Sequence, residues 1–371
     1  MTDATDTLTD AITALVPPLL HALEGLAFIS RHLHPPQFAQ IVDHVGELDR
    51  GVAEGLAIFE AAPWPDDLAG FRDRLVAAAV STQRAYEELR AARDDPNGII
   101  AAYRALRHSS RAMEALYPIA QMLPPVSRFF LDEDQRDDKA LIESLAAEGN
   151  AAQATGIHHF GNEKGTRGGF SLYVPENYDP ARAYPVVFAL HGGSGHGRDF
   201  LWSWIRTARG RGAILVSPTA AGDTWALMGP DEDGPNLMRM LDHVAANWSI
   251  DREKLLLTGM SDGGTFTYVQ GLATDSPFTH LAPISGSFHP FLMEVAESER
   301  VSGLPVYLTH GAKDWMFPPD IARTAYRALA GAGAEIVYRE IGDLSHTYPR
   351  EENARIMDWF LDGTRPPEAS A

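Results

Sequence analysis

The sequence contains no cysteine, which excludes disulfide bonds and thiol catalysis and removes thiolates from any metal site. Basic residues are also scarce, because 31 lysines and arginines stand against 50 aspartates and glutamates, for a formal net charge of −19. Nucleic acids and anionic membranes bind basic surfaces. We therefore expect neither nucleic acid nor membrane as a partner of this chain.

The N-terminus lacks the features of a secretory leader. Its first six residues include two aspartates and no basic residue, and no basic segment is followed by an apolar stretch and a cleavage site of small residues. We also find no apolar stretch of the length that spans a bilayer. These two observations favour a cytoplasmic protein.

The length of 371 residues is more typical of two domains than of one. Hydrophobic residues make up 45% of the chain and charged residues 22%, as in ordinary globular proteins. A change of sequence pattern near residue 150 predicts a helical domain over residues 1–145 and a second domain over residues 146–371.

The first 125 residues have the apolar periodicity of amphipathic helices. Leu15, Leu19, Leu23 and Leu26 recur at steps of three and four, for example. Proline-containing breaks separate four expected helices, at residues 35–36, 62–65, 96–98 and 124–125. Short connections predict an antiparallel bundle. We rank homo-oligomerisation or structural support first among its roles, and a lid or a docking module as alternatives.

Short runs rich in β-branched and apolar residues follow from residue 156 onward. Helical stretches over 234–248, 320–331 and 351–361 lie between them, and this alternation predicts an α/β fold with a mainly parallel sheet covered on both faces. The expected strands are residues 170–174, 184–190, 213–217, 254–258, 281–285, 304–309 and 335–339.

A G-x-S-x-G motif formed by Gly259, Ser261 and Gly263 follows the apolar run 254–258 and precedes a segment that can begin a helix. A strand, this motif and a helix together are typical of a nucleophile elbow, in which a tight turn exposes the serine hydroxyl. Glycines are needed there because side chains would collide with neighbouring backbone. Ser261 is therefore the candidate nucleophile.

A serine nucleophile needs a base, and the base needs a group that orients it. If the chain order is serine, acid, histidine, His346 is the candidate base, because no other histidine follows Asp314. Asp314, directly after the expected strand 304–309, is the candidate acid. Asp320 is its main rival but fits better as a helix N-cap. Asp343 is too close in sequence to His346.

An oxyanion hole needs two backbone N–H donors aimed at the developing charge. The amide of Asp262, directly after the nucleophile, is one candidate. The other is the Gly193 amide in the glycine-rich turn after strand 184–190, with Gly192 or Ser194 as alternatives. The Asp262 carboxylate would disfavour an oxyanion unless its side chain turns away.

Residues 156–365 resemble serine esterases of the α/β-hydrolase superfamily, in the phospholipase/carboxylesterase-like or the polyhydroxybutyrate-depolymerase/feruloyl-esterase-like branch. Many relatives have glycine before the catalytic histidine, where this chain has Ser345. The resemblance implies a Ser261–Asp314–His346 triad and no metal or organic cofactor. The segments that carry it are His191-Gly192-Gly193, Ile250-Asp251-Arg252, Gly259 to Gly264, His310 to Asp314 and Ser345-His346.

The substrate is less well defined by the sequence. Trp225 and Trp315 follow expected strands at the edge that carries the candidate site, and we expect them to bind substrate. No arginine cluster indicates a charged substrate, which favours a neutral small-molecule ester with an aromatic or short acyl part. The histidine pairs 32/34 and 158/159 have no third ligand at suitable spacing, so we expect no metal.

These observations favour a serine carboxylic-ester hydrolase that works through an acyl-enzyme. A thioesterase or peptidase with the same triad is one alternative. A non-catalytic interaction protein built on a hydrolase scaffold is another, from a different functional class.

Overall fold

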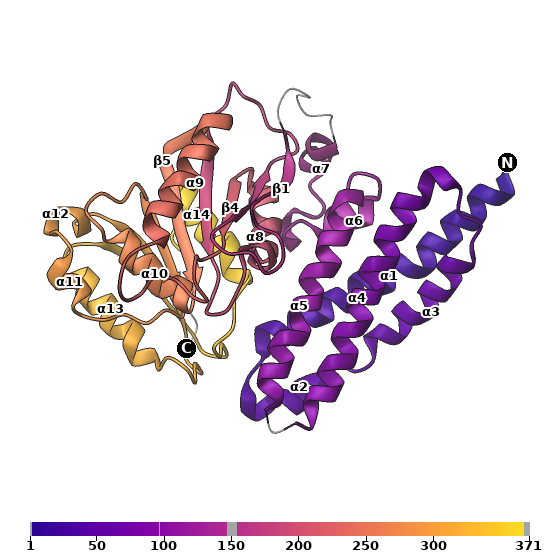
Figure 1. The fold of residues 1–371 in the computed structure, drawn as a ribbon, viewed down its shortest axis with the longest axis horizontal. Coiled ribbons are helices and arrows are strands. Elements are labelled where there is room, and N and C mark those ends of the chain that lie inside the picture. The colour runs from indigo at the N-terminus through magenta and orange to yellow at the C-terminus, as the bar shows by residue number, and fades with distance from the viewer. Residues whose placement is uncertain (1, 96, 147–153, 367–371) are drawn as a thin grey trace. The chain divides into compact units, whose positions relative to one another are not determined.

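The computed structural model describes residues 2–95, 97–146 and 154–366. The chain divides into two compact units, Met1–Ile142 and Glu143–Ala371 (Figure 1). This division lies close to the boundary expected between residues 145 and 146. Pro96, within one of the expected helix breaks, lies outside the described residues.

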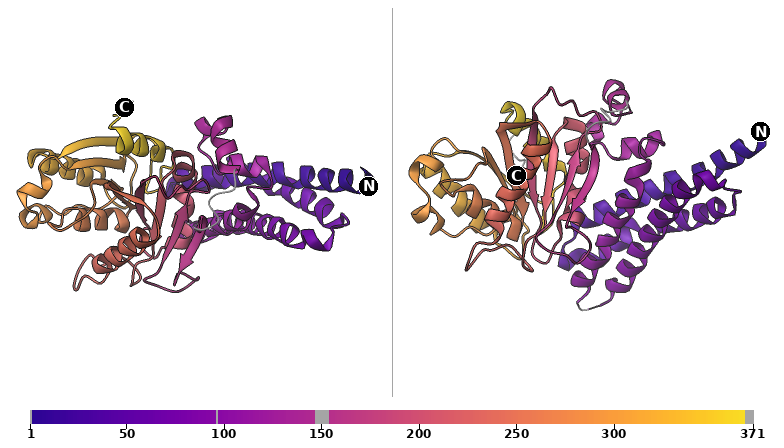
Figure 2. Two further views of the ribbon diagram at one scale, coloured as in Figure 1. Left: turned by 90° about the horizontal axis from the view of Figure 1, so that it is seen from above. Right: turned by 45° about the horizontal axis from the view of Figure 1, so that its top comes forward.

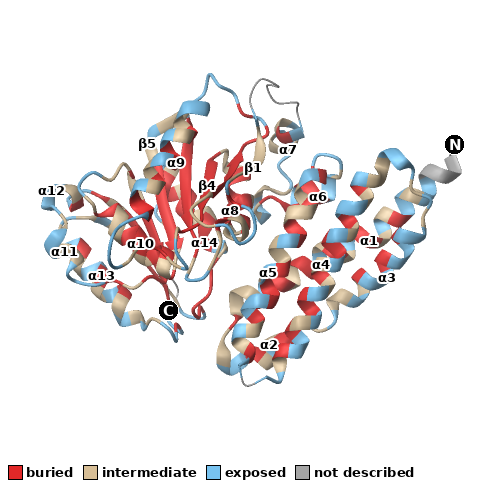
Figure 3. Cartoon of the chain, in the orientation of Figure 1, coloured by how far each residue is buried: buried red, intermediate tan, exposed pale blue. Residues whose placement is uncertain are grey.

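The first unit is a helical bundle. Leu15, Leu19, Leu23 and Leu26 are all buried, and Figure 3 shows buried positions recurring along one side of each long helix. The Tyr86 hydroxyl donates a hydrogen bond to the Ala22 carbonyl at 2.8 Å inside this core. The helices are α1 (Thr2–His32), α2 (Phe38–Val45), α3 (Leu48–Ala61), α4 (Ala69–Arg93), α5 (Gly98–Leu116) and α6 (Pro124–Phe129), with α7 (Lys139–Ala146) following them.

The bundle differs from the expected four helices at the second one, which is divided into α2 and α3. Gly46 follows α2 with a φ of 69°, and its amide donates to the Val42 carbonyl. Glycine adopts this left-handed region readily, so the helix ends there and a new one starts at Leu48. The expected helices end only at prolines, and this glycine is a break that the proline pattern does not mark.

Helix α1 also corrects the expectation about apolar stretches. Its segment Asp6–His32 has a mean hydropathy of 1.6 and is long and apolar enough to cross a membrane by length and composition. The buried leucines of this helix nevertheless pack against α3 and α4 within the bundle. A core helix of a soluble protein passes the same test, so the property alone assigns no membrane.

The second unit is built on an eight-stranded sheet with the order β1-β2-β4-β3-β5-β6-β7-β8. Strands β1 and β2 pair antiparallel, as do β2 and β4, whereas every pairing from β4 to β8 is parallel. The strands are β1 (Gly156–Phe160), β2 (Phe170–Val174), β3 (Tyr184–Leu190), β4 (Ile214–Pro218), β5 (Ile250–Met260), β6 (His280–Ile284), β7 (Pro305–Gly311) and β8 (Glu335–Ile341).

Helices lie on both faces of this sheet (Figure 2), so the fold is α/β with a mainly parallel sheet, as expected. Because both faces are covered, β2, β3 and β4 are buried at every position. The helices are α8 (Gly197–Arg211), α9 (Asp233–Asn247), α10 (Asp262–Gly271), α11 (Leu292–Val295), α12 (Ser298–Val301), α13 (Pro319–Gly331) and α14 (Glu351–Asp362).

Candidate active site

Ser261 lies in the turn between β5 and α10, at the end of the central part of the sheet. Its φ of 57° and ψ of −120° are unusual for a residue other than glycine. The surrounding backbone holds this conformation, because the Ser261 amide donates to the Ile284 carbonyl of β6 at 3.0 Å. Such strain concentrates at functional sites.

The positions on either side of the Ser261 turn, Gly259 and Gly263, leave no room for a side chain. A Cβ at Gly259 would lie 2.5 Å from the Gly263 carbonyl carbon, and a Cβ at Gly263 would lie 2.5 Å from the His191 oxygen. Both distances are far below van der Waals contact. The motif therefore permits β5 and α10 to approach closely enough to form the turn.

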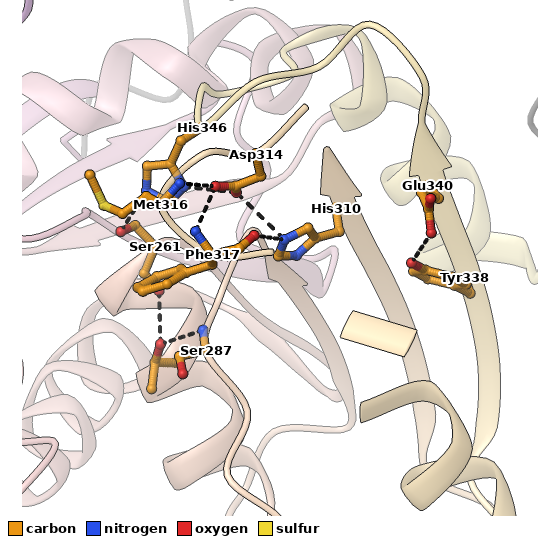
Figure 4. A network of polar contacts seen from close by, with 10 residues as sticks. Ser261, Ser287, His310, Asp314, Met316, Phe317, Tyr338, Glu340 and His346 are labelled. Atoms are coloured by element: carbon orange, nitrogen blue, oxygen red, sulfur yellow. Dashed lines mark hydrogen bonds and ion pairs between the residues drawn. The ribbon is translucent and has the colours of Figure 1, made fainter. Parts of the chain in front are cut away.

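Three expected residues meet at this turn (Figure 4). His346 Nε2 lies 3.0 Å from Ser261 Oγ, and His346 Nδ1 lies 2.8 Å from Asp314 Oδ2. Asp314 follows β7 and His346 follows β8, so both come from loops at the carboxyl edge of the sheet. All three side chains are buried. With the ring proton on Nδ1, the imidazole donates to Asp314 and accepts from the serine hydroxyl.

Asp314 is held in one orientation and kept ionised. Its Oδ1 accepts hydrogen bonds from the amides of Met316 at 2.9 Å and Phe317 at 2.8 Å, while Oδ2 faces His346. Burial acts to raise the pKa of Asp314, but the hydrogen bond with His346 and the Phe317 amide outweigh burial and leave this pKa below its ordinary value.

His310 lies in the same motif as Asp314, but the sequence predicts no role for it. Its Nε2 donates to the Phe317 carbonyl at 2.8 Å and lies 3.5 Å from Asp314 Oδ2. Burial lowers the pKa of His310, which favours the neutral ring. The Phe317 ring contacts the His346 ring edge-on, with centroids 5.3 Å apart. His310 thus supports the turn that holds both Asp314 and His346.

The rival acid Asp320 does not occupy the site. Helix α13 begins at Pro319, after Pro318 at the N-cap position, so the expectation that Asp320 caps this helix is wrong. Asp320 is instead exposed in the first turn, where its carboxylate pairs with Arg323 at 2.9 Å.

The candidate oxyanion donors remain Gly193 and Asp262. The Ser194 amide donates to the Asp223 carbonyl at 3.0 Å, which removes Ser194 as an alternative to Gly193. Asp262 is the first residue of α10, where an amide has no acceptor within the helix. Neither the Gly193 nor the Asp262 amide hydrogen-bonds to another described residue. Gly192 stays an alternative.

The two tryptophans differ in their surroundings. Trp225 is only 3% exposed, and its indole N–H donates to the His191 carbonyl at 2.7 Å. It also stacks on Phe266, with ring centroids 5.2 Å apart. The Trp225 ring thus packs in the core beneath the turn after β3, and its expected substrate contact stays a prediction. Trp315 is 45% exposed, and its expected substrate contact stays a prediction.

The histidine pair weighed as metal ligands lies in β1, an edge strand that is absent from the expected strands. His158 Nε2 contacts the Thr155 carbonyl at 3.0 Å, and His159 Nδ1 contacts the Ser171 hydroxyl at 2.8 Å. Among the described residues, no group of three or more potential ligands is placed to hold a metal ion.

Similarity to known proteins covers part of the chain. The chain is 29% identical over 124 residues to a probable feruloyl esterase C of Aspergillus terreus, covering 32% of this chain and 46% of that protein. The strand order, the elbow and the spatially assembled triad agree with this similarity. The second unit therefore has an α/β-hydrolase fold. We call it the hydrolase unit.

The chain is also similar to a second curated protein and to a solved structure. A bifunctional acetylxylan esterase/xylanase of Neocallimastix patriciarum is 26% identical over 163 residues, which cover 43% of this chain and 23% of that protein. A solved truncated carbohydrate esterase from gut microbiota has a TM-score of 0.48 at 13% identity, covering 58% of this chain and 99% of its own. No family model matches the chain. The chain spans about half the length, or less, of the curated relatives it matches.

Proposed function

We propose that the hydrolase unit is a serine carboxylic-ester hydrolase that works through an acyl-enzyme. The observation that carries the proposal is the continuous contact from Asp314 through His346 to Ser261, at 2.8 Å and 3.0 Å. This arrangement places a base on the serine hydroxyl and an ionised carboxylate on the far side of the base.

In the proposed reaction, Ser261 Oγ attacks the ester carbonyl carbon while His346 Nε2 takes the hydroxyl proton. The negative charge on the former carbonyl oxygen is stabilised by the Gly193 and Asp262 amides. His346 then protonates the leaving alcohol, and the acyl group stays on Ser261. Water, deprotonated by His346, releases the acid and restores the serine.

The names of the relatives support an oxygen ester as the substrate. Two curated relatives are called a feruloyl esterase and an acetylxylan esterase. We expect a neutral ester with an aromatic or short acyl part. A thioester or peptide substrate would use the same triad, and comparison of kcat/KM for matched oxygen esters, thioesters and amides separates these possibilities.

The direct test compares turnover of p-nitrophenyl acetate by the wild-type chain with turnover by Ser261→Ala. The substitution removes the nucleophile, and we expect kcat to fall by about 10⁴-fold or more. Ser302→Ala, at an exposed serine of the same unit, is the matched control and should keep wild-type turnover. Wild-type turnover by folded Ser261→Ala would refute the assignment. No turnover of any ester by the wild-type chain would favour the non-catalytic alternative.

A further inference from the structure

The side chain of Asp262 does not turn away from the expected oxyanion hole. A Cβ built on Gly193 would lie 2.6 Å from Asp262 Oδ2 and 3.4 Å from its Cγ. The carboxylate therefore lies directly against the Cα of Gly193, the residue whose amide is the second expected donor. Only glycine leaves room for this contact with the carboxylate in its present position.

The Thr224 hydroxyl holds the Asp262 carboxylate in that position. Thr224 Oγ1 donates a hydrogen bond to Asp262 Oδ2 at 2.5 Å, the short distance typical of a charge-assisted bond. Thr224 belongs to the loop after β4. Buried Asp233 orders this loop, because its two carboxylate oxygens accept the amides of Ala221 and Ala226, each at 2.8 Å.

The same loop supports the Gly193 turn at neighbouring points. The Asp223 carbonyl accepts the Ser194 amide at 3.0 Å. The Arg167 guanidinium joins the two segments as well, because it donates to the Gly222 carbonyl at 2.8 Å and to the Gly195 carbonyl at 2.6 Å. The backbone that directly follows Gly193 is thus tied to the loop that carries Thr224.

We propose that Asp262 and Thr224 form a clasp that sets the position of the Gly193 amide. Asp262 then serves the oxyanion hole twice, because its amide is one donor and its side chain positions the other. This inference rests on the proposed function, and it makes Asp262 and Thr224 positioning residues. Its physical basis is that a donor stabilises a developing charge only when it is held in place before the reaction.

A carboxylate near a developing oxyanion has an electrostatic cost, and two features offset it. The Thr224 hydroxyl donates to the carboxylate oxygen that lies nearest Gly193. Asp262 also lies at the N-terminus of α10, where the helix dipole stabilises negative charge. The hydrogen-bonding geometry, rather than the negative charge, is therefore the property that the clasp needs.

The first test uses paired substitutions with p-nitrophenyl acetate as substrate. Thr224→Val removes the hydroxyl at constant shape, and we expect kcat to fall about 10- to 100-fold while KM changes less than about threefold. Thr224→Ser and Asp262→Asn keep a hydroxyl donor and a side-chain acceptor, so both should stay within about threefold of wild-type kcat. Thr324→Val, at a half-buried threonine of α13, controls for the substitution itself.

The second test examines the contact with Gly193. Gly193→Ala should lower kcat strongly, because its Cβ would displace the carboxylate. Asp262→Ala should lower it by about the same factor as Thr224→Val. The double variant Gly193→Ala/Asp262→Ala should then be no slower than the slower single variant. Losses that instead multiply would mean that the two side chains do not interact, and would overturn the clasp.

Two further results would also overturn the proposed clasp. One is unchanged kcat in folded Thr224→Val, with melting temperature as the check on folding. The other is an equal loss in Asp262→Asn and Asp262→Ala, which would assign the effect to charge. Labelling of Ser261 by a fluorophosphonate in the wild-type chain tests the proposed function separately, because it involves no substitution at Asp262 or Thr224.

Discussion

At the scale of single residues, Asp314 has the most constrained side chain of the site. Two backbone amides hold Oδ1, His346 contacts Oδ2, and His310 lies 3.5 Å from the same oxygen. These contacts fix the ring of His346 with its Nε2 toward Ser261. The orientation of the base therefore depends on one carboxylate.

We predict that Asp314→Asn lowers kcat by about 10³- to 10⁴-fold, because an amide that donates to Nδ1 forces the His346 proton onto Nε2. Steady-state kinetics on p-nitrophenyl acetate measures the change. Asp320→Asn removes the rival carboxylate, which is exposed and paired with Arg323, and should leave kcat unchanged. A large loss in Asp320→Asn with little loss in Asp314→Asn would reverse the assignment of the acid.

The sequence predicted that Ser261, Asp314 and His346 meet, because chain order and strand position leave few choices for each. It did not predict the support from His310, since the contact with Phe317 depends on how one turn folds back on β7. It also placed Trp225 in the substrate site. It did not predict that this ring is buried, with its indole N–H donating to the His191 carbonyl.

At the scale of elements, the site depends on the close approach of β5, the elbow and α10. A strand, a strained serine and a helix follow one another within a few residues, and β3 passes beside them. Such a junction tolerates no additional atoms, so the glycines of the motif should contribute to stability as well as to catalysis.

We predict that Gly263→Ala lowers both melting temperature and kcat, because its Cβ would lie 2.5 Å from the Leu190 and His191 carbonyl oxygens. Forced overlap with backbone typically costs about 1–3 kcal/mol or more. Gly331→Ala, with no atom within 4 Å of the added Cβ, is the matched control and should be neutral or slightly stabilising. Thermal melts and steady-state kinetics on both variants measure the changes in melting temperature and kcat. Equal behaviour of the two would contradict the packing argument.

Strand positions were predicted well where both faces are buried, since a short apolar run between turn residues is typical of a strand in a covered parallel sheet. Strand β1 was not expected because each of its residues is half-buried and two are histidines. The division between α2 and α3 was missed because it depends on the backbone angle of Gly46 rather than on a proline. Strand β1 was missed because its sequence is weakly apolar, and the break between α2 and α3 was missed because glycine permits many backbone conformations.

At the scale of the whole molecule, the two units have separate cores. The bundle buries its leucines among helices, and the hydrolase unit buries aliphatic and aromatic side chains around its sheet. Homo-oligomerisation through the bundle and a cytoplasmic location stay predictions. The stability of the hydrolase unit should depend on pH, and this dependence can be measured without any substrate.

We predict that the hydrolase unit loses stability as the pH falls from about 6.5 toward 4. Burial, and then the charge of Lys254, lower the pKa of His280 to about 4 from an ordinary 6.5. In this window the unfolded chain binds a proton at His280 that the folded chain does not, so the free energy of unfolding decreases with falling pH. With partial exposure of the ring, we expect a loss on the order of 1–2 kcal/mol.

The lowered pKa of Asp314 acts in the same direction, because its contribution to stability is lost as the pH falls through the folded-state value. Denaturant melts between pH 4 and 7 measure the effect of His280, and melts continued below pH 4 add that of Asp314, whose ordinary pKa is 3.8. His280→Gln should flatten the dependence, whereas His289→Gln, at an exposed histidine, should not. An unchanged slope in folded His280→Gln would contradict the assignment to that residue.

The measurement that tests the central claim most directly is labelling of the wild-type chain with a fluorophosphonate, followed by peptide mapping. The probe reacts with a serine only when a base activates it. The account predicts one modified serine, Ser261, and loss of labelling in His346→Ala. A folded wild-type chain that stays unlabelled, or is labelled at a different serine, would contradict the assignment of the site.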